Sequence, residues 1–144
     1  MKKKILILAG GYSKEREISL QTAKSVIVEL KRNNKYICKI IEPDGNFLKN
    51  LRQFRPKIVL NLLHGRYGED GYVQSILEIE KINYTHSGPL ASSIAINKDL
   101  SKKIFIKNNL LTPKYINFKF KNNYKINNLK KKIKVKLGFP VVIK

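Results

Sequence analysis

Apolar runs alternate with amphipathic stretches through the first part of the chain. Runs typical of buried strands occupy, in order, residues 3–9, 36–41, 57–63 and 83–85. The segments between them have apolar positions that recur every three or four residues, as on one face of a helix, over 17–31, 46–54 and 71–81. This alternation predicts an α/β fold with a parallel sheet and helices on both of its faces.

The pattern changes after the turn at 87–89. A helical stretch over 90–96 leads into another over 98–108, and Thr112-Pro113 then breaks the chain. The remaining elements expected are a weak strand over 115–120, an exposed helix within 121–136 and a strand-like run over 141–143.

The charge balance shifts at the same place in the chain. Residues 1–97 hold 16 basic and 9 acidic residues, whereas residues 98–144 hold 14 basic residues and 1 acidic residue. Because composition and hydrophobic pattern change together, we predict two domains, residues 1–97 and residues 98–144.

The net charge of +20 makes nucleic acid a partner to consider. However, lysine, isoleucine and asparagine dominate the composition, as expected from A/T-rich codons, and lysine outnumbers arginine although base readout favours arginine. A basic nucleic-acid-binding module is therefore only an alternative reading.

No stretch reaches the roughly 18 apolar residues that span a bilayer. The single cysteine, Cys38, fits a reducing compartment, so we expect no membrane partner and a cytoplasmic location.

Two glycine-containing loops carry the candidate chemistry. The first, Gly10-Gly11-Tyr12-Ser13, follows the first strand and precedes Glu15, which lies near the positive end of a helix. This loop lacks the spacing of a dinucleotide fingerprint or a P-loop. Glu15 itself has two readings, either a solvated carboxylate or a ligand for an ammonium group. The second loop follows the third strand and places His64 near Glu69 and Asp70 among three glycines. Open α/β sheets bind ligands at the carboxyl ends of their strands, so both loops are expected to face one crevice.

Four motifs follow one another along nearly the whole chain. They are GGYSKEREISL at 10–20, LHGRYGEDG at 63–71, YTHSGPLAS at 84–92 with Asn97-Lys98, and LGFPVVIK at 137–144. In the order and spacing of these motifs the chain resembles the N-terminal part of D-alanine–D-alanine ligases, which are members of the ATP-grasp superfamily. The first two motifs are specific to this ligase within the superfamily, and the last is shared more widely.

The resemblance implies a fold and a set of residue roles. Residues 1–97 would form a Rossmann-like, pre-ATP-grasp domain, and residues 98–144 the incomplete beginning of the ATP-grasp domain. By motif position, the carboxylate of Glu15 would hold the ammonium group of a first D-alanine, Ile18 would shape the pocket for its methyl group, and His64 would lie near its carboxylate. This places Glu15 and His64 as the candidate catalytic pair.

The resemblance also implies ATP as a substrate, with Lys98 and Lys144 contacting its phosphates. The reaction in the family joins two D-alanines for peptidoglycan synthesis, and it uses Mg²⁺. Only one acidic residue follows residue 97, so the metal ligands are absent from this chain. We therefore predict that this polypeptide alone does not catalyse the ligation. The family also implies a homodimer formed through the N-terminal region.

Two residues depart from the family pattern, and two readings of the function stay open beside the main one and the nucleic-acid alternative. His86 stands where the family has a glycine, which tests the backbone conformation there, and Asn97 replaces an aspartate. A ligase that uses D-lactate or D-serine as its second substrate would share these motifs. A stand-alone domain that binds a small ligand would bind D-alanine through Glu15 but would not bind ATP.

Overall fold

The computed structural model describes residues 2–118 and 126–143, and the chain divides into two compact units, Met1–Lys98 and Asp99–Lys144. The first unit confirms the predicted α/β fold. Its sheet has the strand order β2-β1-β3, and β1 is parallel to both neighbours. The strands are β1 (Lys3–Leu8), β2 (Tyr36–Ile41) and β3 (Ile58–Asn61).

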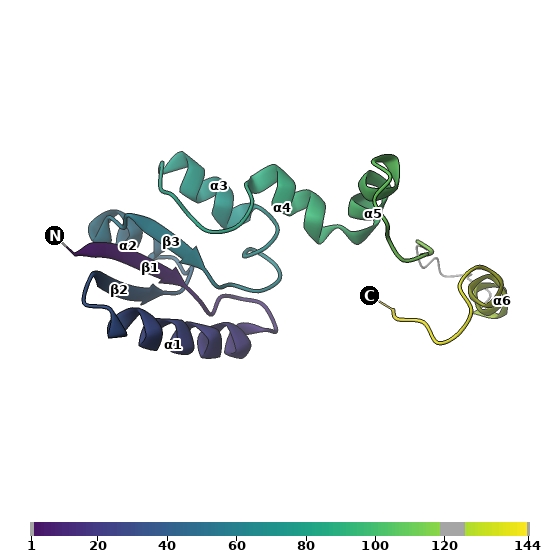
Figure 1. The fold of residues 1–144 in the computed structure, drawn as a ribbon, viewed down its shortest axis with the longest axis horizontal. Helices are drawn as coiled ribbons and strands as arrows, with labels where there is room; N and C mark the ends of the chain where they lie inside the picture. The colour runs from purple at the N-terminus through teal and green to yellow at the C-terminus, as the bar shows by residue number, and fades with distance from the viewer. Residues whose placement is uncertain (1, 119–125, 144) are drawn as a thin grey trace. The chain divides into compact units, whose positions relative to one another are not determined.

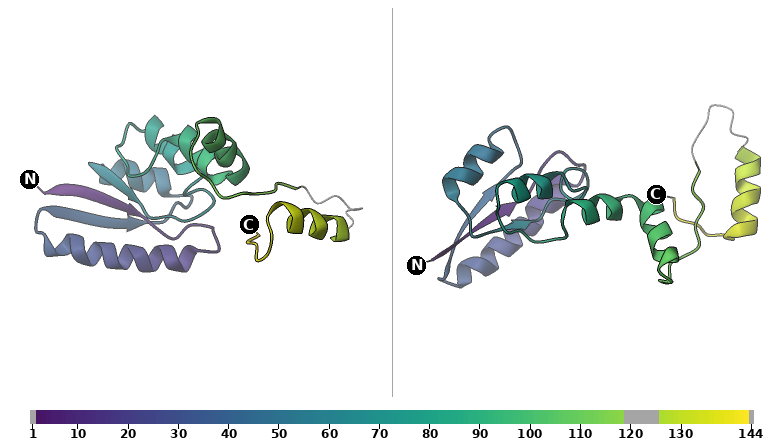
Figure 2. Two further views of the ribbon diagram at one scale, coloured as in Figure 1. Left: turned by 45° about the vertical axis from the view of Figure 1, so that its right-hand side comes forward. Right: turned by 90° about the horizontal axis from the view of Figure 1, so that it is seen from above.

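Helices cover both faces of this sheet, as Figures 1 and 2 show. The helices of the first unit are α1 (Arg16–Arg32), α2 (Phe47–Phe54), α3 (Tyr72–Ile79) and α4 (Pro89–Ile96). Helix α1 packs on one face, where Ala23 joins Ile5 and Ile7 of β1 in an apolar cluster. Helices α2 and α3 pack on the other face, where Leu51 and Leu77 join a second cluster.

The central strand explains why the sheet needs two helical layers. Successive side chains of a strand point to opposite faces, and from Ile5 onward both sets are apolar. Leu6 and Leu8 belong to the cluster with α2 and α3, whereas Ile5, Ile7 and Ala9 belong to the cluster with α1. All five side chains are buried, so β1 holds the two layers together and fixes where its following loop begins.

The prediction of a fourth strand over 83–85 is wrong. The structure has only an isolated parallel bridge between Val59 and Tyr84. The Val59 N–H donates to Asn83 O (2.8 Å) and the Thr85 N–H donates to Val59 O (3.0 Å). The next donor, the Asn61 N–H, bonds the side-chain Oγ1 of Thr85 (3.0 Å) instead of a backbone carbonyl, so the ladder ends there.

The bridged segment is tied to α3 through the hydroxyl group of Tyr84. This hydroxyl donates to Glu78 Oε1 (2.8 Å). Burial, together with this hydrogen bond to the Glu78 carboxylate, raises the pKa of Tyr84 to about 12. The phenol therefore stays protonated near neutral pH and keeps its role as donor.

The second unit contains two helices among the residues described, α5 (Lys98–Lys107, which begins at the last residue of the first unit) and α6 (Ile126–Lys136). Both were expected from the sequence. The expected strands are not found in the described residues 115–118 and 141–143, and residues 119–120 lie outside the described part. A strand requires a hydrogen-bonded partner, which alternation of apolar residues cannot supply by itself.

His86 adopts a left-handed backbone conformation, with φ of 87°. Glycine takes this conformation without the contact between Cβ and backbone that other residues suffer. We expect His86→Gly to raise the free energy of unfolding by about 1 kcal/mol, measured by urea denaturation of the two proteins. A lower free energy of unfolding would instead show that the contact between His86 Nδ1 and Thr85 Oγ1 (3.2 Å) outweighs the strain.

Candidate functional site

The sheet order identifies one crevice as the expected position of a ligand. The chain passes from the central strand β1 through α1 to β2, which forms one edge of the sheet. It then passes through α2 to β3, which pairs with the other edge of β1. The strand order therefore reverses between β1 and β3, and open α/β sheets bind ligands at such a point, beyond the carboxyl ends of the strands. The loops that carry Glu15 and His64 both begin there.

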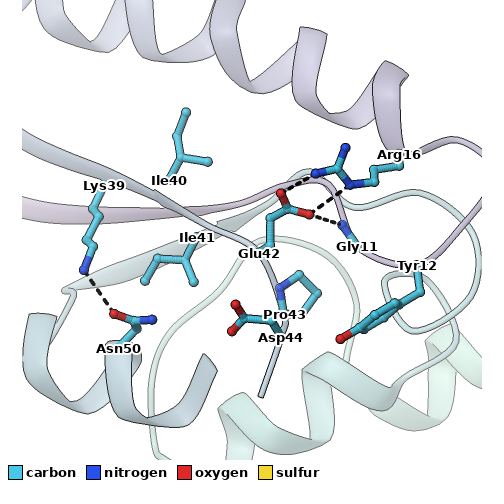
Figure 3. A pocket seen from close by; sticks show the side chains of 10 residues that line it. All are labelled: Gly11, Tyr12, Arg16, Lys39, Ile40, Ile41, Glu42, Pro43, Asp44 and Asn50. Carbon is cyan, nitrogen blue, oxygen red and sulfur yellow. Dashed lines mark hydrogen bonds and ion pairs between the residues drawn. The ribbon is translucent and has the colours of Figure 1, made fainter. Parts of the chain in front are cut away.

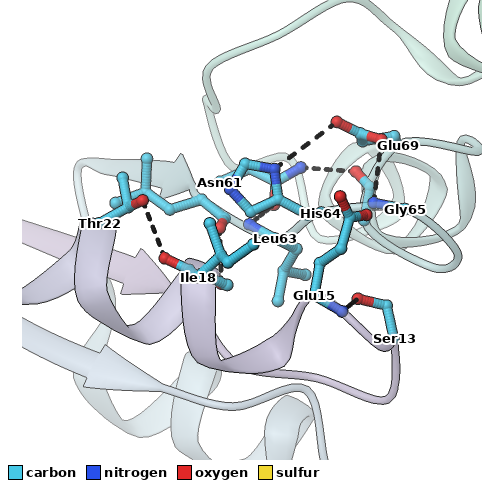
Figure 4. Close-up of polar contacts among 12 residues, drawn as sticks. Ser13, Glu15, Ile18, Thr22, Asn61, Leu63, His64, Gly65 and Glu69 are labelled. Carbon is cyan, nitrogen blue, oxygen red and sulfur yellow. Dashed lines mark hydrogen bonds and ion pairs between the residues drawn. The ribbon is translucent and has the colours of Figure 1, made fainter.

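The structure brings these two loops into contact. Glu15 immediately precedes α1, and its N–H donates to Ser13 Oγ (3.1 Å). Gly65 has φ of 68°, and a Cβ atom placed on it would lie 3.3 Å from Glu15 Oε2 and 3.5 Å from Ser13 Cβ. Figure 4 shows the Glu15 side chain extending from the start of α1 toward the loop of His64 and Gly65. The carboxylate and the imidazole therefore lie on neighbouring loops, which follow the carboxyl ends of β1 and β3.

Ile18 lies three residues beyond Glu15, on the same side of α1. Its side chain is 55 % exposed. An apolar side chain this exposed, on the same side of the helix as Glu15, offers an apolar contact surface to a bound molecule.

The two imidazole nitrogens of His64 differ in their surroundings. Nδ1 lies 4.0 Å from Glu69 Oε1, and the other oxygen of Glu69 accepts the Gly65 N–H (2.9 Å). Nε2 is buried and makes no hydrogen bond with the residues that the structure describes. A buried polar atom without a partner is costly, so Nε2 is suited to a polar group of a ligand.

Two buried amide side chains hold the His64 loop in place, and neither is predicted from the sequence. Asn61 Nδ2 and Gln74 Nε2 each donate to Gly68 O, at 2.8 Å and 2.7 Å. Asn61 Oδ1 also accepts the Leu63 N–H (3.2 Å). The available signals were an asparagine ending an apolar strand and a glutamine on the apolar face of the next helix, and both side chains are only 1 % exposed.

Ser19 connects the two loops at their base. The Gly10 N–H donates to Ser19 Oγ (2.8 Å), and this hydroxyl donates to Leu62 O (2.6 Å). Ser19 is fully buried, so one side chain of α1 links the end of β1 to the segment that follows β3.

Comparison with known proteins shows which enzymes the chain is similar to. The chain is 59 % identical over 144 residues, all of its length, to a D-alanine–D-alanine ligase of Pelagibacter ubique, and 41 % identical over 141 residues to one of Carboxydothermus hydrogenoformans. It spans 46 % and 45 % of these relatives, slightly less than half of their length. This chain corresponds to the N-terminal portion of the D-alanine–D-alanine ligases. No family model matches the sequence.

Solved structures of D-alanine–D-alanine ligases share the fold. A D-alanine–D-alanine ligase from Bacillus anthracis, crystallised with ATP, has a TM-score of 0.74 and 32 % identity, with 91 % of this chain and 43 % of that chain covered. The ligase from Coxiella burnetii has a TM-score of 0.76 at 22 % identity, over 95 % of this chain and 50 % of that one, which shows the fold alone.

An ion pair stabilises the first motif of this ligase portion. Arg16 Nε and Nη2 donate to the two carboxylate oxygens of Glu42, at 3.1 Å and 2.6 Å, and Glu42 Oε2 also accepts the Gly11 N–H (3.2 Å). The hydrogen bonds and charge of Glu42 raise the pKa of Arg16. The pair joins the start of α1 to the residue that follows β2, and the bond from the Gly11 N–H ties the loop after β1 to the same carboxylate.

A surface hollow of about 610 Å³ lies beside this ion pair, as Figure 3 shows. Its lining includes Tyr12, Lys39 and Asn50, and Lys39 Nζ donates to Asn50 Oδ1 (3.3 Å). Neither Glu15 nor His64 lines it. The hollow lies at the carboxyl end of β2, whereas the crevice of the ligase motifs lies between β1 and β3.

The two lysines expected to contact ATP differ in what the structure describes. Lys98 is exposed at the end of the first unit, and its Nζ donates to Ala95 O (2.9 Å). Lys144 lies outside the described residues.

In the described ranges, no three His, Cys, Asp or Glu side chains come together as a metal site would require. None of the helices there is long and apolar enough to cross a membrane.

Proposed function

We propose that residues 1–97 form the binding domain for the first D-alanine of an ATP-dependent D-alanine–D-alanine ligase, and that residues 98–144 begin its ATP-grasp domain. The observation that carries the proposal is the meeting of the Glu15 and His64 loops in the crevice between β1 and β3. The sequence and fold similarity to D-alanine–D-alanine ligases supports the choice of substrate.

The chemistry of the crevice suits a small zwitterion. The Glu15 carboxylate would pair with the substrate ammonium group, because an ion pair inside a crevice is screened less than one in bulk water. A protonated His64 Nε2 would donate to the substrate carboxylate and so satisfy a buried atom that has no partner among the described residues. Ile18 would contact the methyl group.

In the proposed whole ligase, ATP phosphorylates the carboxylate of the first D-alanine and releases ADP. The amine of the second D-alanine then attacks the acyl phosphate, and phosphate leaves as the peptide bond forms. Within this chain, Lys98 and Lys144 would contribute positive charge to the phosphates, where preorganised cations stabilise the transition state. To do so, the Lys98 ammonium would exchange its bond to Ala95 O for a phosphate oxygen.

The described residues do not fit the Mg²⁺ that the family uses. The one acidic side chain after residue 97, Asp99, is paired with Lys103 at 2.7 Å. No step of the reaction is therefore assigned to a metal held by this chain. The homodimer, the cytoplasmic location and the role in peptidoglycan synthesis stay predictions that rest on the family.

A titration with D-alanine, followed by ¹H–¹⁵N NMR, tests the proposed site. We expect saturable chemical-shift changes in Ser13 to Ser19 and in Leu63 to Glu69, with much smaller changes for L-alanine because its methyl group would point away from Ile18. Changes that are absent at saturating D-alanine, or equal for the two enantiomers, would contradict the proposal. Strong, salt-dependent RNA or DNA binding would favour the nucleic-acid alternative instead.

A further inference from the structure

Three tyrosine rings form a continuous cluster across the two loops of the crevice. Tyr12 belongs to the loop after β1, Tyr67 to the loop after β3, and Tyr72 begins α3. The Tyr12 and Tyr67 ring centroids are 6.2 Å apart at 82°, and those of Tyr67 and Tyr72 are 5.2 Å apart at 68°. Both arrangements are edge-to-face, the geometry that aromatic pairs favour.

The middle ring is held by a backbone that is unusual for tyrosine. Tyr67 has φ of 68°, in the left-handed region that costs energy for residues other than glycine. Its N–H donates to Asp70 Oδ2 (2.9 Å), and its carbonyl accepts the Val73 N–H (3.2 Å). A glycine would adopt this conformation without strain, so what tyrosine adds at this position is the ring and its contacts. The guanidinium carbon of Arg66 lies 4.9 Å from the centroid of that ring.

The cluster is too exposed to act mainly as core. Tyr12 is 71 % exposed and Tyr72 is 55 % exposed, so burial of these rings contributes little to the stability of the whole unit. The contact between Tyr12 and Tyr67 instead joins two loops that touch at a second place, where Gly65 packs against Ser13 and Glu15. Two separate contacts define the spacing of two loops better than one.

We propose that Tyr12 and Tyr67 form an aromatic clasp that positions Glu15 and His64 for D-alanine, a role that rests on the proposed function. Tyr12 is three residues before Glu15, and Tyr67 is three residues after His64. The contact between the two rings therefore links the two loops within three residues of each functional side chain. Tyr12 and Tyr67 act through Glu15 and His64 and do not themselves touch the substrate, so they are positioning residues.

Three variants of the full chain test the clasp. Tyr12→Ala removes the ring, Tyr12→Phe keeps it without the hydroxyl group, and Tyr72→Ala removes a ring that contacts Tyr67 but does not join the two loops. For each we would measure the nuclear Overhauser contact between Gly65 Hα and the Glu15 side chain, the D-alanine Kd, and the midpoint of thermal unfolding.

We expect Tyr12→Ala to lose the Gly65–Glu15 contact and to raise the D-alanine Kd about three- to tenfold, the effect of one aromatic pair, with the unfolding midpoint close to that of the wild type. Tyr12→Phe and Tyr72→Ala should retain both the contact and the affinity. The clasp is overturned if Tyr12→Ala keeps the contact, or if Tyr12→Phe loses as much as Tyr12→Ala. If the wild type binds no D-alanine, the proposed function fails, whereas selective loss of the contact in Tyr12→Ala still supports the clasp.

Discussion

Replacing Glu15 with glutamine is expected to weaken D-alanine binding about 10- to 100-fold, the range for one charged hydrogen bond. Glutamine has the size of glutamate, and the backbone N–H that donates to Ser13 Oγ is unchanged, so the start of α1 should keep its structure. What is lost is the negative charge opposite the substrate ammonium group. Isothermal titration of the wild type and Glu15→Gln with D-alanine measures the change.

Glu17→Gln is the matched control for this experiment. Glu17 lies two residues away on α1, its side chain is 78 % exposed, and it pairs with Arg16 Nη1 (3.0 Å). An exposed pair of this kind contributes little, so the D-alanine Kd of Glu17→Gln should stay within about twofold of the wild type. Equal losses in the two variants would mean that D-alanine senses the general charge of this surface, and that Glu15 is not a specific ligand.

The sheet of the first unit was predictable from the sequence because its determinants are local. The run from Ile5 to Ala9 is apolar at every position, as a strand buried on both faces must be. Helix α1 shows apolar positions at helical spacing, and α2 ends before Pro56 as expected. Parallel strands place their carboxyl ends at one edge, so the expectation that Glu15 and His64 face one crevice followed from topology.

The contacts that hold those two side chains in place could not be predicted in the same way. The pair of Arg16 with Glu42 and the bonds of Asn61 and Gln74 to Gly68 O depend on which strands and helices are neighbours. A single sequence shows each of these side chains only as a polar residue beside an apolar run. Their partners become apparent once the order β2-β1-β3 is known.

The expected strands that are wrong share one cause. Residues 83–85, 115–118 and 141–143 have suitable side chains, but a strand also requires a neighbour along its whole length. At Tyr84, β3 pairs through one residue only. The next N–H on this edge of β3, that of Asn61, donates to the Thr85 side chain and not to a backbone carbonyl. Pattern alone predicts which segments are able to extend, and not which of them find a partner.

Gly71→Ala is expected to lower the free energy of unfolding by about 3 kcal/mol, the combined cost of an overpacked contact and a left-handed alanine. Gly71 has φ of 95°, and a Cβ atom there would lie 2.5 Å from Pro89 O and 2.7 Å from Ser93 Oγ. Both atoms belong to α4, and Ser93 Oγ also donates to Asp70 O (2.6 Å). The junction of α3 and α4 would have to open, which urea denaturation detects as a lower midpoint.

Gly45→Ala separates this contact from the general effect of removing a glycine. A Cβ atom on Gly45 would meet no heavy atom within 4 Å, and the backbone there is not left-handed. Alanine should therefore leave the free energy of unfolding unchanged or raise it by about 0.5 kcal/mol, through a less flexible unfolded chain. If Gly71→Ala were as stable as Gly45→Ala, α3 and α4 would not be in the close contact that ends the His64 loop at Gly71. The position of that loop would then depend on its other contacts, among them the bonds of Asn61 and Gln74 to Gly68 O.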